Sequence, residues 1–192
     1  YNGLRVISVV DSENPEEVGS YDTDGLAFGI TLSGNFAYVA NGENGLRILS
    51  VANPEHPEEV GHFDTESWVM DVVVSGTYAY LADLRGGLRI ISVDDPEQPE
   101  EVGFYVTPGS ARAIEVSGDY AYIADDTRGL RVISIADPEH PEEVGFCDNN
   151  GKAYGVSVFG DYACIADYRR GLRVISIADP ENPFEVGFYD TE

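Results

Sequence analysis

The feature that most constrains this chain is an internal repeat. The triplet Gly-Leu-Arg recurs every 42 residues with no insertion or deletion, beginning at Gly3, Gly45, Gly87, Gly129 and Gly171. A strict period of this length is typical of solenoids, propellers and other arrays in which each unit packs on its neighbours. The chain is therefore predicted to be a series of similar units that share one domain.

Each period contains four short segments with strand character, here called A, B, C and D. In the second period we expect them at residues 27–32, 36–41, 45–51 and 59–64. Ser33-Gly34-Asn35 predicts a tight turn between A and B. Segment C is apolar on both faces, which predicts a strand buried between neighbouring sheets. The proline-containing segment before D predicts a turn, because proline cannot donate to a strand ladder.

Four antiparallel strands per unit of this length predict an all-β fold, a β-propeller with about four and a half blades in this chain. A solenoid of β-coils is the alternative, although its turns usually need a shorter period. The expected units are a partial blade at 1–22 (C and D only) and whole blades at 23–64, 65–106, 107–148 and 149–192. Because this count leaves unpaired hairpins, we expect the ring to be completed by residues of a longer chain or by a second chain.

The repeated residues resemble a known family. The run Gly-Leu-Arg-Val-Ile-Ser, the Asp-Pro-Glu turn, the Glu-Val-Gly strand and the Ala-Tyr-Val-Ala type of strand are similar to the LVIVD repeat of bacterial and archaeal β-propeller domains, many of them surface-exposed. The resemblance covers the whole chain, with one regular departure: the family commonly has Asp where this chain has Ser8, Ser50, Ser92, Ser134 and Ser176. It implies a propeller fold and suggests a surface location, but it implies no activity.

The charge of the chain limits its partners. There are 35 acidic and 11 basic residues, a formal net charge of −24. Such a field repels nucleic acids and anionic membrane surfaces, so neither is an expected partner. No apolar run approaches the roughly 20 residues of a membrane span, so membrane insertion is not expected. Heavy acidity with a single lysine suits an extracellular or salt-adapted protein, and a role in solubility explains it equally well. We expect an extracellular or cell-surface location.

Propeller topology would place the D–A and B–C loops on one face, here called the variable face, and the C–D loops on the other. The C–D loops are nearly uniform and hold 19 of the 35 acidic residues. They could coordinate Ca²⁺ through carboxylates, but EF-hand spacing is absent and a solvated acidic rim explains them equally well. We expect no cofactor, with calcium as the open alternative.

The loops of the variable face differ from unit to unit, and the cations outside the Gly-Leu-Arg triplets gather there. Loops that vary on a rigid scaffold are where binding normally resides. Unconstrained drift is the alternative. We therefore predict a non-catalytic scaffold that binds a protein or carbohydrate partner. The candidate binding residues are Trp68, Met70, Arg85, Arg112, Arg128, Lys152, Tyr154, Tyr168, Arg169 and Arg170.

The repeated arginines are interpreted as structural. Each begins strand C at the end where an aspartate finishes the antiparallel strand D, and such cross-strand charge pairs contribute about 0.2 to 1 kcal/mol. The expected pairs are Arg5–Asp22, Arg47–Asp64, Arg131–Asp148 and Arg173–Asp190. In the remaining unit Val106 replaces the aspartate, so Arg89 is expected to turn to Asp83.

Two cysteines replace aromatic residues of the repeat. Cys147 takes the position of Tyr105 in strand D, and Cys164 takes the position of Tyr122 in strand B of the next unit. If the two positions pack together, a disulfide would stabilise the fold by about 3 kcal/mol. Two independent small residues in the core are the alternative.

Recognisable catalytic machinery is absent from the sequence. The three histidines lie toward the acidic side, and no nucleophile–base set or phosphate-binding loop is present. Asp71 and Glu115 lie on strand A and are candidates to line the central channel, where paired carboxylates could act on a sugar. An enzyme acting on an anionic or sugar substrate at the channel mouth is therefore the alternative to the binding scaffold.

Overall fold

The computed structural model describes residues 3–148 and 151–191, and this part of the chain forms one two-stranded and four four-stranded antiparallel sheets. The first sheet comprises β1 (Leu4–Ser8) and β2 (Glu16–Tyr21). The second comprises β3 (Gly29–Ser33), β4 (Phe36–Ala40), β5 (Leu46–Ser50) and β6 (Glu58–Phe63). The third comprises β7 (Asp71–Ser75), β8 (Tyr78–Asp83), β9 (Gly87–Ser92) and β10 (Glu100–Tyr105). The fourth comprises β11 (Ala113–Ser117), β12 (Tyr120–Ala124), β13 (Leu130–Ser134) and β14 (Glu142–Cys147). The fifth comprises β15 (Ala153–Phe159), β16 (Tyr162–Asp167), β17 (Gly171–Ser176) and β18 (Phe184–Tyr189).

The strands follow the predicted four-segment pattern, with ends that differ by at most two residues in the second unit. The predicted tight turn between A and B is present: β3 pairs with β4 from Gly29–Ala40 to Ser33–Phe36. Gly34 at its tip has a φ of 57°, in the left-handed region that favours glycine.

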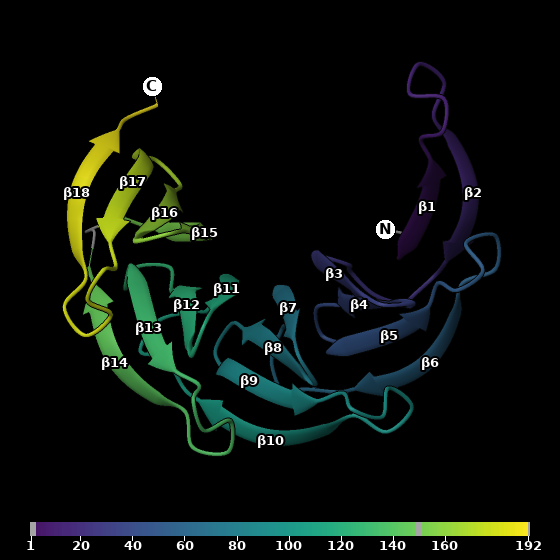
Figure 1. The fold of residues 1–192 in the computed structure, drawn as a ribbon, viewed down its shortest axis with the longest axis horizontal. Helices are drawn as coiled ribbons and strands as arrows, with labels where there is room; N and C mark the ends of the chain where they lie inside the picture. Colours follow the sequence, from purple (N-terminus) through teal and green to yellow (C-terminus); the bar gives the residue numbers. More distant parts are fainter. Residues whose placement is uncertain (1–2, 149–150, 192) are drawn as a thin grey trace.

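The sheets follow one another along an open arc (Figure 1). Strands β3, β7, β11 and β15 lie on the inside of the arc, and β2, β6, β10, β14 and β18 lie on its outside. The sheet of β1 and β2 lies at one end and the sheet of β15–β18 at the other. The repeating four-stranded architecture is therefore confirmed. Because no closed ring forms within the described residues, the closed propeller stays a prediction.

The core lies between successive sheets. Leu46 and Ile48 of β5, for example, pack in one cluster with Ile91 of β9 and with Val93, which follows β9. The third strands β5, β9 and β13 are buried on both faces, as predicted, because one face meets the preceding sheet and the other the following sheet. Each fully buried aliphatic side chain of this size contributes about 1.5 to 3 kcal/mol to folding.

In D strands that are followed by another described sheet, a glycine lets the C–D loop of that sheet approach closely. A Cβ atom on Gly145 of β14 would overlap the carbonyl oxygen of Pro180 and lie 2.9 Å from the Cδ of Pro183. Gly61 and Gly103 face the carbonyl oxygens of Pro96 and Pro138 in the same way. The Glu-Val-Gly segment and the proline-containing C–D loop therefore form one repeated contact.

Candidate functional site

The D–A and B–C loops lie on the same face, as predicted. Isolated antiparallel bridges join the B–C loop of one sheet to the residues just before or at the start of the first strand of the next: Gly42–Val69, Leu84–Ala111 and Asp126–Ala153. The Gly42 N–H donates to the Val69 carbonyl at 3.1 Å, and the reverse bond is 3.0 Å. These bonds attach the variable loops to the frame of the neighbouring sheet, so the variable face is a continuous surface.

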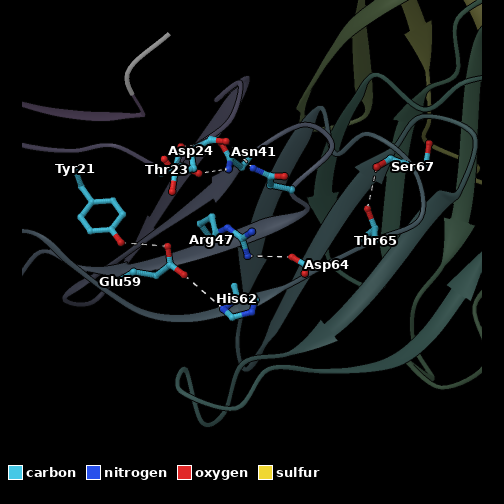
Figure 2. Close-up of polar contacts among 11 residues, drawn as sticks. Tyr21, Thr23, Asp24, Asn41, Arg47, Glu59, His62, Asp64, Thr65 and Ser67 are labelled. Carbon is cyan, nitrogen blue, oxygen red and sulfur yellow. Dashed lines mark hydrogen bonds and ion pairs between the residues drawn. The ribbon is translucent and has the colours of Figure 1, made fainter.

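A buried polar residue lies beneath each of these loops, at the end of strand B. Asn41, Asp83, Asp125 and Asp167 are the four members. In the second sheet the Thr23 hydroxyl donates to the Asn41 Oδ1 at 2.7 Å, and the Asn41 amide donates back to the Thr23 carbonyl at 2.7 Å (Figure 2). Because Thr23 follows the preceding sheet, each such pair ties two sheets together.

The same tie recurs with aspartate as the acceptor. The Thr107 hydroxyl donates to Asp125 at 2.6 Å, and the Thr65 hydroxyl donates to Asp83 at 3.2 Å. Burial raises the pKa values of Asp83 and Asp125, although the threonine hydrogen bonds oppose that rise. This repeated hydrogen bond from a threonine hydroxyl to a buried Asp or Asn was not predicted from the sequence. The recurrence of Thr and of Asp or Asn at the 42-residue period is the signal that would have found it.

Three of the four expected arginine–aspartate pairs are present. Arg47 lies 3.0 Å from Asp64 (Figure 2). Two further expected pairs are present, Arg131–Asp148 at 2.8 Å and Arg173–Asp190 at 3.0 Å. Three of these arginines also stack on a phenylalanine of the adjacent D strand: Arg89 on Phe104, Arg131 on Phe146 and Arg173 on Phe188.

Two arginines have other partners. Arg89 reaches Asp83 at 3.5 Å, which confirms the expectation for the unit where Val106 replaces the aspartate, and it also lies 3.3 Å from Glu101. Arg5, expected to pair with Asp22, forms an ion pair with Glu17 at 2.7 Å. Glu17 and Glu101 occupy the same position of strand D, so this glutamate is a second carboxylate within reach of the repeated arginine.

On the variable face, the predicted binding residues form two separate groups. The first is aromatic: the rings of Phe28 and Trp68 lie 6.0 Å apart, from successive sheets. Gly42 lies against both rings, since a Cβ there would be 3.1 Å from Phe28 and 3.6 Å from Trp68. Trp68 also lines a depression with Asp22, Asp24 and Glu43, so this end of the face is acidic and aromatic.

The second group, here called the Arg–Tyr stack, combines cations with aromatic rings. The guanidinium of Arg112 lies over the Tyr154 ring at 4.2 Å, and Tyr154 stacks on Tyr168 with centroids 5.1 Å apart. Arg169 lies over the Tyr168 ring at 5.5 Å. Arg112 also forms an ion pair with Asp126, with the nitrogen and the carboxylate oxygen 3.5 Å apart. Four of the ten predicted binding residues therefore make one continuous stack across two sheets.

A depression of about 460 Å³ opens beside this stack. Its lining includes Lys152, Tyr168, Arg169 and Arg170, which come from the D–A and B–C loops of the last sheet. The buried Asp167 lies at its base and accepts the backbone N–H of Lys152 at 3.0 Å. In a chain with a net charge of −24, three cations around one depression make a local region of opposite sign.

The other predicted binding residues do not join either group. Arg85 and Arg128 are exposed in their B–C loops, and Met70 is half-buried before β7. The Arg85 backbone N–H donates to the Ser67 hydroxyl at 3.2 Å.

The two channel candidates are close neighbours. Asp71 accepts backbone N–H bonds from Val72 at 2.9 Å and from Ile114 of the next inner strand at 3.1 Å. Burial raises the pKa of Asp71. Burial, together with the charge of Asp71, raises the pKa of Glu115. Asp71 therefore links the inner strands β7 and β11 next to Glu115, through the N–H of the preceding residue Ile114.

Both cysteines are free thiols in the structure, so the predicted disulfide is wrong. Cys147 packs in the cluster between the fourth and fifth sheets. The tyrosines that correspond to Cys164 each pack against the following sheet, as Tyr122 does, so Cys164 lies on the far face of the fifth sheet. The fifth sheet separates the two sulfur positions.

One side chain in each C–D loop caps the turn. It accepts the N–H two residues on, as in Asp95–Glu97 at 3.1 Å and Asp137–Glu139 at 3.2 Å. His140 also lies 3.1 Å from Asp137. Across residues 3–148 and 151–191, no three His, Cys, Asp or Glu side chains are grouped so that they could hold a metal ion. Among the same residues there is no helix long and apolar enough to cross a membrane.

A family model confirms the resemblance seen in the sequence. The LVIVD repeat matches four times, at residues 24–65, 68–107, 108–149 and 150–191. The chain belongs to the LVIVD repeat family. The four matches of the LVIVD repeat correspond to the four four-stranded sheets. No curated protein sequence matches the chain.

Solved structures with the same fold include two designed proteins. The computationally designed Ika8 protein matches with a TM-score of 0.72 and 8% identity, over 92% of this chain. This chain spans only 54% of the Ika8 chain. The computationally designed Ika4 protein matches with a TM-score of 0.68 and 11% identity, over 84% of this chain and 98% of that one. At such identities the likeness establishes the fold alone.

Proposed function

We propose that this LVIVD-repeat chain is a non-catalytic scaffold that binds an anionic partner through its variable face. The observation that carries the proposal is the Arg–Tyr stack beside the cationic depression. The stack offers flat rings to a ligand, and Lys152, Arg169 and Arg170 offer positive charge. A ligand with carboxylate groups on a ring, such as an acidic sugar, would use both.

Exposure of the outer members supports a binding role over a packing role. Tyr168 is 60% exposed and Tyr154 is 37% exposed, although their rings stack on each other and Arg169 lies 5.5 Å from the Tyr168 ring centroid. The inner end of the stack is fixed, because Arg112 is paired with Asp126. A ligand ring would therefore meet a platform whose geometry is already set, which reduces the entropy lost on binding.

The position of Asp71 supports a scaffold rather than an enzyme. Its carboxylate accepts two backbone N–H groups: that of Val72 in its own strand, and that of Ile114, which holds β11 against β7. A carboxylate in that role stabilises the packing of the inner strands, and Glu115 alone provides no acid–base pair.

The proposal also covers the setting of the chain. We propose that the sheets are blades of a β-propeller in a secreted or cell-surface protein. The support is the arc of sheets, the family match and the strongly acidic composition.

The test is isothermal titration calorimetry with uronic-acid oligomers and with neutral oligosaccharides of the same length. We expect binding of the uronic-acid oligomers only, weakened by added salt because exposed charges are screened. The double variant Tyr168→Ala/Arg169→Ala should lose it. Arg85→Ala, which removes an exposed cation of the same face outside the stack, should bind like the wild type. Equal binding of neutral and acidic oligomers, or no effect of the double variant, would contradict the proposal.

A further inference from the structure

The acidic and aromatic end of the variable face holds the only tryptophan of the chain. Trp68 comes from the loop before β7 and lines a depression of about 410 Å³, here called the Trp68 depression. The other lining residues come from the D–A and B–C loops of the second sheet: Asp22, Asp24, Gly25, Leu26 and Glu43. Loops of two successive sheets therefore combine an indole ring with three carboxylates.

Hydrogen bonds between the loops fix the shape of the Trp68 depression. The Asn44 side-chain amide donates to the Asp24 carbonyl at 2.8 Å, which holds the D–A loop of the second sheet against the B–C loop of the same sheet. The Gly42 N–H donates to the Val69 carbonyl at 3.1 Å, which joins that B–C loop to the loop of Trp68. The ring and the carboxylates are thus held in place before any ligand binds.

The carboxylates of the depression have no basic partner among the residues that the structure describes. Asp22 was expected to pair with Arg5, which contacts Glu17 at 2.7 Å instead. One oxygen of Asp22 accepts the Asp24 N–H at 3.2 Å, and no described arginine or lysine forms an ion pair with Asp24 or Glu43. The aspartates that correspond to Asp22 in the second, fourth and fifth sheets are all paired with arginine. The depression therefore favours a cation.

Elsewhere the chain repeatedly combines a ring, a carboxylate and an arginine. The Arg131 guanidinium lies 4.7 Å from the Phe146 ring centroid and 2.8 Å from Asp148, and the third and fifth sheets contain the same kind of group. Trp68 has a ring neighbour, Phe28, at 6.0 Å, but no described arginine or lysine lies over its ring. The Trp68 depression therefore has the ring and the carboxylates of this group without its cation. Tryptophan is the aromatic side chain that attracts cations most strongly.

We propose that the Trp68 depression binds an arginine side chain of a protein partner. Trp68 is 38% exposed, so a flat guanidinium can stack on its ring while the N–H groups donate to the neighbouring carboxylates. Lysine carries a compact, strongly hydrated charge and cannot stack in this way. One arginine neutralises only one of the three carboxylates, so we expect it to come from a basic segment of a polypeptide. This site takes the opposite charge to the Arg–Tyr stack and does not depend on it.

The single tryptophan makes the site its own reporter, because the fluorescence of Trp68 is not mixed with that of another tryptophan. The probe is the acetylated and amidated peptide Gly-Arg-Gly-Arg-Gly, titrated at constant ionic strength over about 0.01 to 10 mM, a range suited to weak contacts. We expect a saturable change in Trp68 fluorescence. The peptide with citrulline, the neutral analogue of arginine, should give none. The lysine peptide and N-acetyl-arginine amide should each bind at least tenfold more weakly.

Two double variants separate the site from the overall charge of the chain. Asp24→Asn/Glu43→Gln keeps the shape of both side chains, and asparagine tolerates the φ of 54° at residue 24 as aspartate does. This variant should bind the arginine peptide at least tenfold more weakly. Glu97→Gln/Glu139→Gln removes the same charge from exposed positions in the C–D loops of the opposite face and should bind like the wild type. Circular dichroism should show the same β-type spectrum for both variants.

The outcomes also separate this proposal from that for the Arg–Tyr stack. Tyr168→Ala/Arg169→Ala should keep the response to the arginine peptide, and Asp24→Asn/Glu43→Gln should keep any binding of uronic-acid oligomers. No fluorescence change in the wild type, or an equal change with the citrulline peptide, would overturn the proposal. Equal binding of the lysine peptide would rule out stacking of a guanidinium, and equal binding of N-acetyl-arginine amide would rule out a polypeptide segment as the ligand. Equal losses in the two double variants would show that only the overall charge acts.

Discussion

A matched pair of glycine substitutions tests how the sheets pack. Gly145 and Gly187 occupy the same position of the Glu-Val-Gly motif, in β14 and β18. Neither has the left-handed φ that would strain an alanine. Gly145→Ala would place a methyl group against the Pro180 carbonyl oxygen, 2.9 Å from Pro183 Cδ and 3.1 Å from the carbonyl carbon of Glu181. Gly187→Ala would place the same methyl group in open space.

The expected effects have opposite signs. Ordinary contacts of this kind need about 3.5 Å, so the fourth and fifth sheets must separate by about 1 Å at the Pro180 carbonyl in Gly145→Ala. Overpacking of this size costs about 1 to 3 kcal/mol, whereas alanine in an unobstructed strand is favoured over glycine by about 0.5 to 1 kcal/mol. In a domain of this length, 1 kcal/mol corresponds to about 2 to 4 °C in melting temperature.

The assay is thermal unfolding followed by circular dichroism. Gly145→Ala should melt several degrees below the wild type, and Gly187→Ala should melt at or slightly above it. If the two variants shift the melting temperature equally, the close contact between strand D and the next C–D loop does not limit packing, and the reasoning fails.

Three further predictions concern buried groups. Thr107→Val should lower the free energy of unfolding by about 1 to 3 kcal/mol in urea denaturation, because it removes the 2.6 Å hydrogen bond to the buried Asp125; an unchanged unfolding midpoint would contradict the tie between sheets. Burial raises the pKa of Asp125, so the folded chain keeps the Asp125 carboxyl protonated to a higher pH than the unfolded chain does. The stability that this protonation contributes is lost as the pH rises from the ordinary aspartate range through the raised pKa. Asp125→Asn should remove that downward slope when the wild type and the variant are compared by urea denaturation from acid to neutral pH, and parallel curves would argue against a raised pKa. A thiol-reactive reagent should label two free thiols per denatured chain. In the folded chain Cys147 should react more slowly than an exposed thiol, because burial raises its pKa. If no thiol reacts after denaturation, the two cysteines form a disulfide and this prediction fails.

Local pattern determined most of the fold in advance. The period, the proline-containing loops and the Ser33-Gly34-Asn35 turn depend on neighbouring residues, so they predicted the four strands of each unit within a few residues. The Arg131–Asp148 pair was also predictable, because an antiparallel hairpin places those two strand ends side by side. The identity of each repeat as an LVIVD unit follows from the same short-range pattern.

Relations between sheets could not be derived in this way. Cys147 and Cys164 lie in successive repeats, yet they are on opposite sides of the fifth sheet. The repeat pattern does not show which face of a sheet packs against which neighbouring sheet. The stack of Arg112 on Tyr154 joins residues one full repeat apart, and it depends on the curvature of the arc. The sequence by itself determined the repeating unit, because strands and turns follow from local chemistry. Only the tertiary structure decided which variable residues meet and which faces stay exposed, because those depend on how one sheet packs against the next.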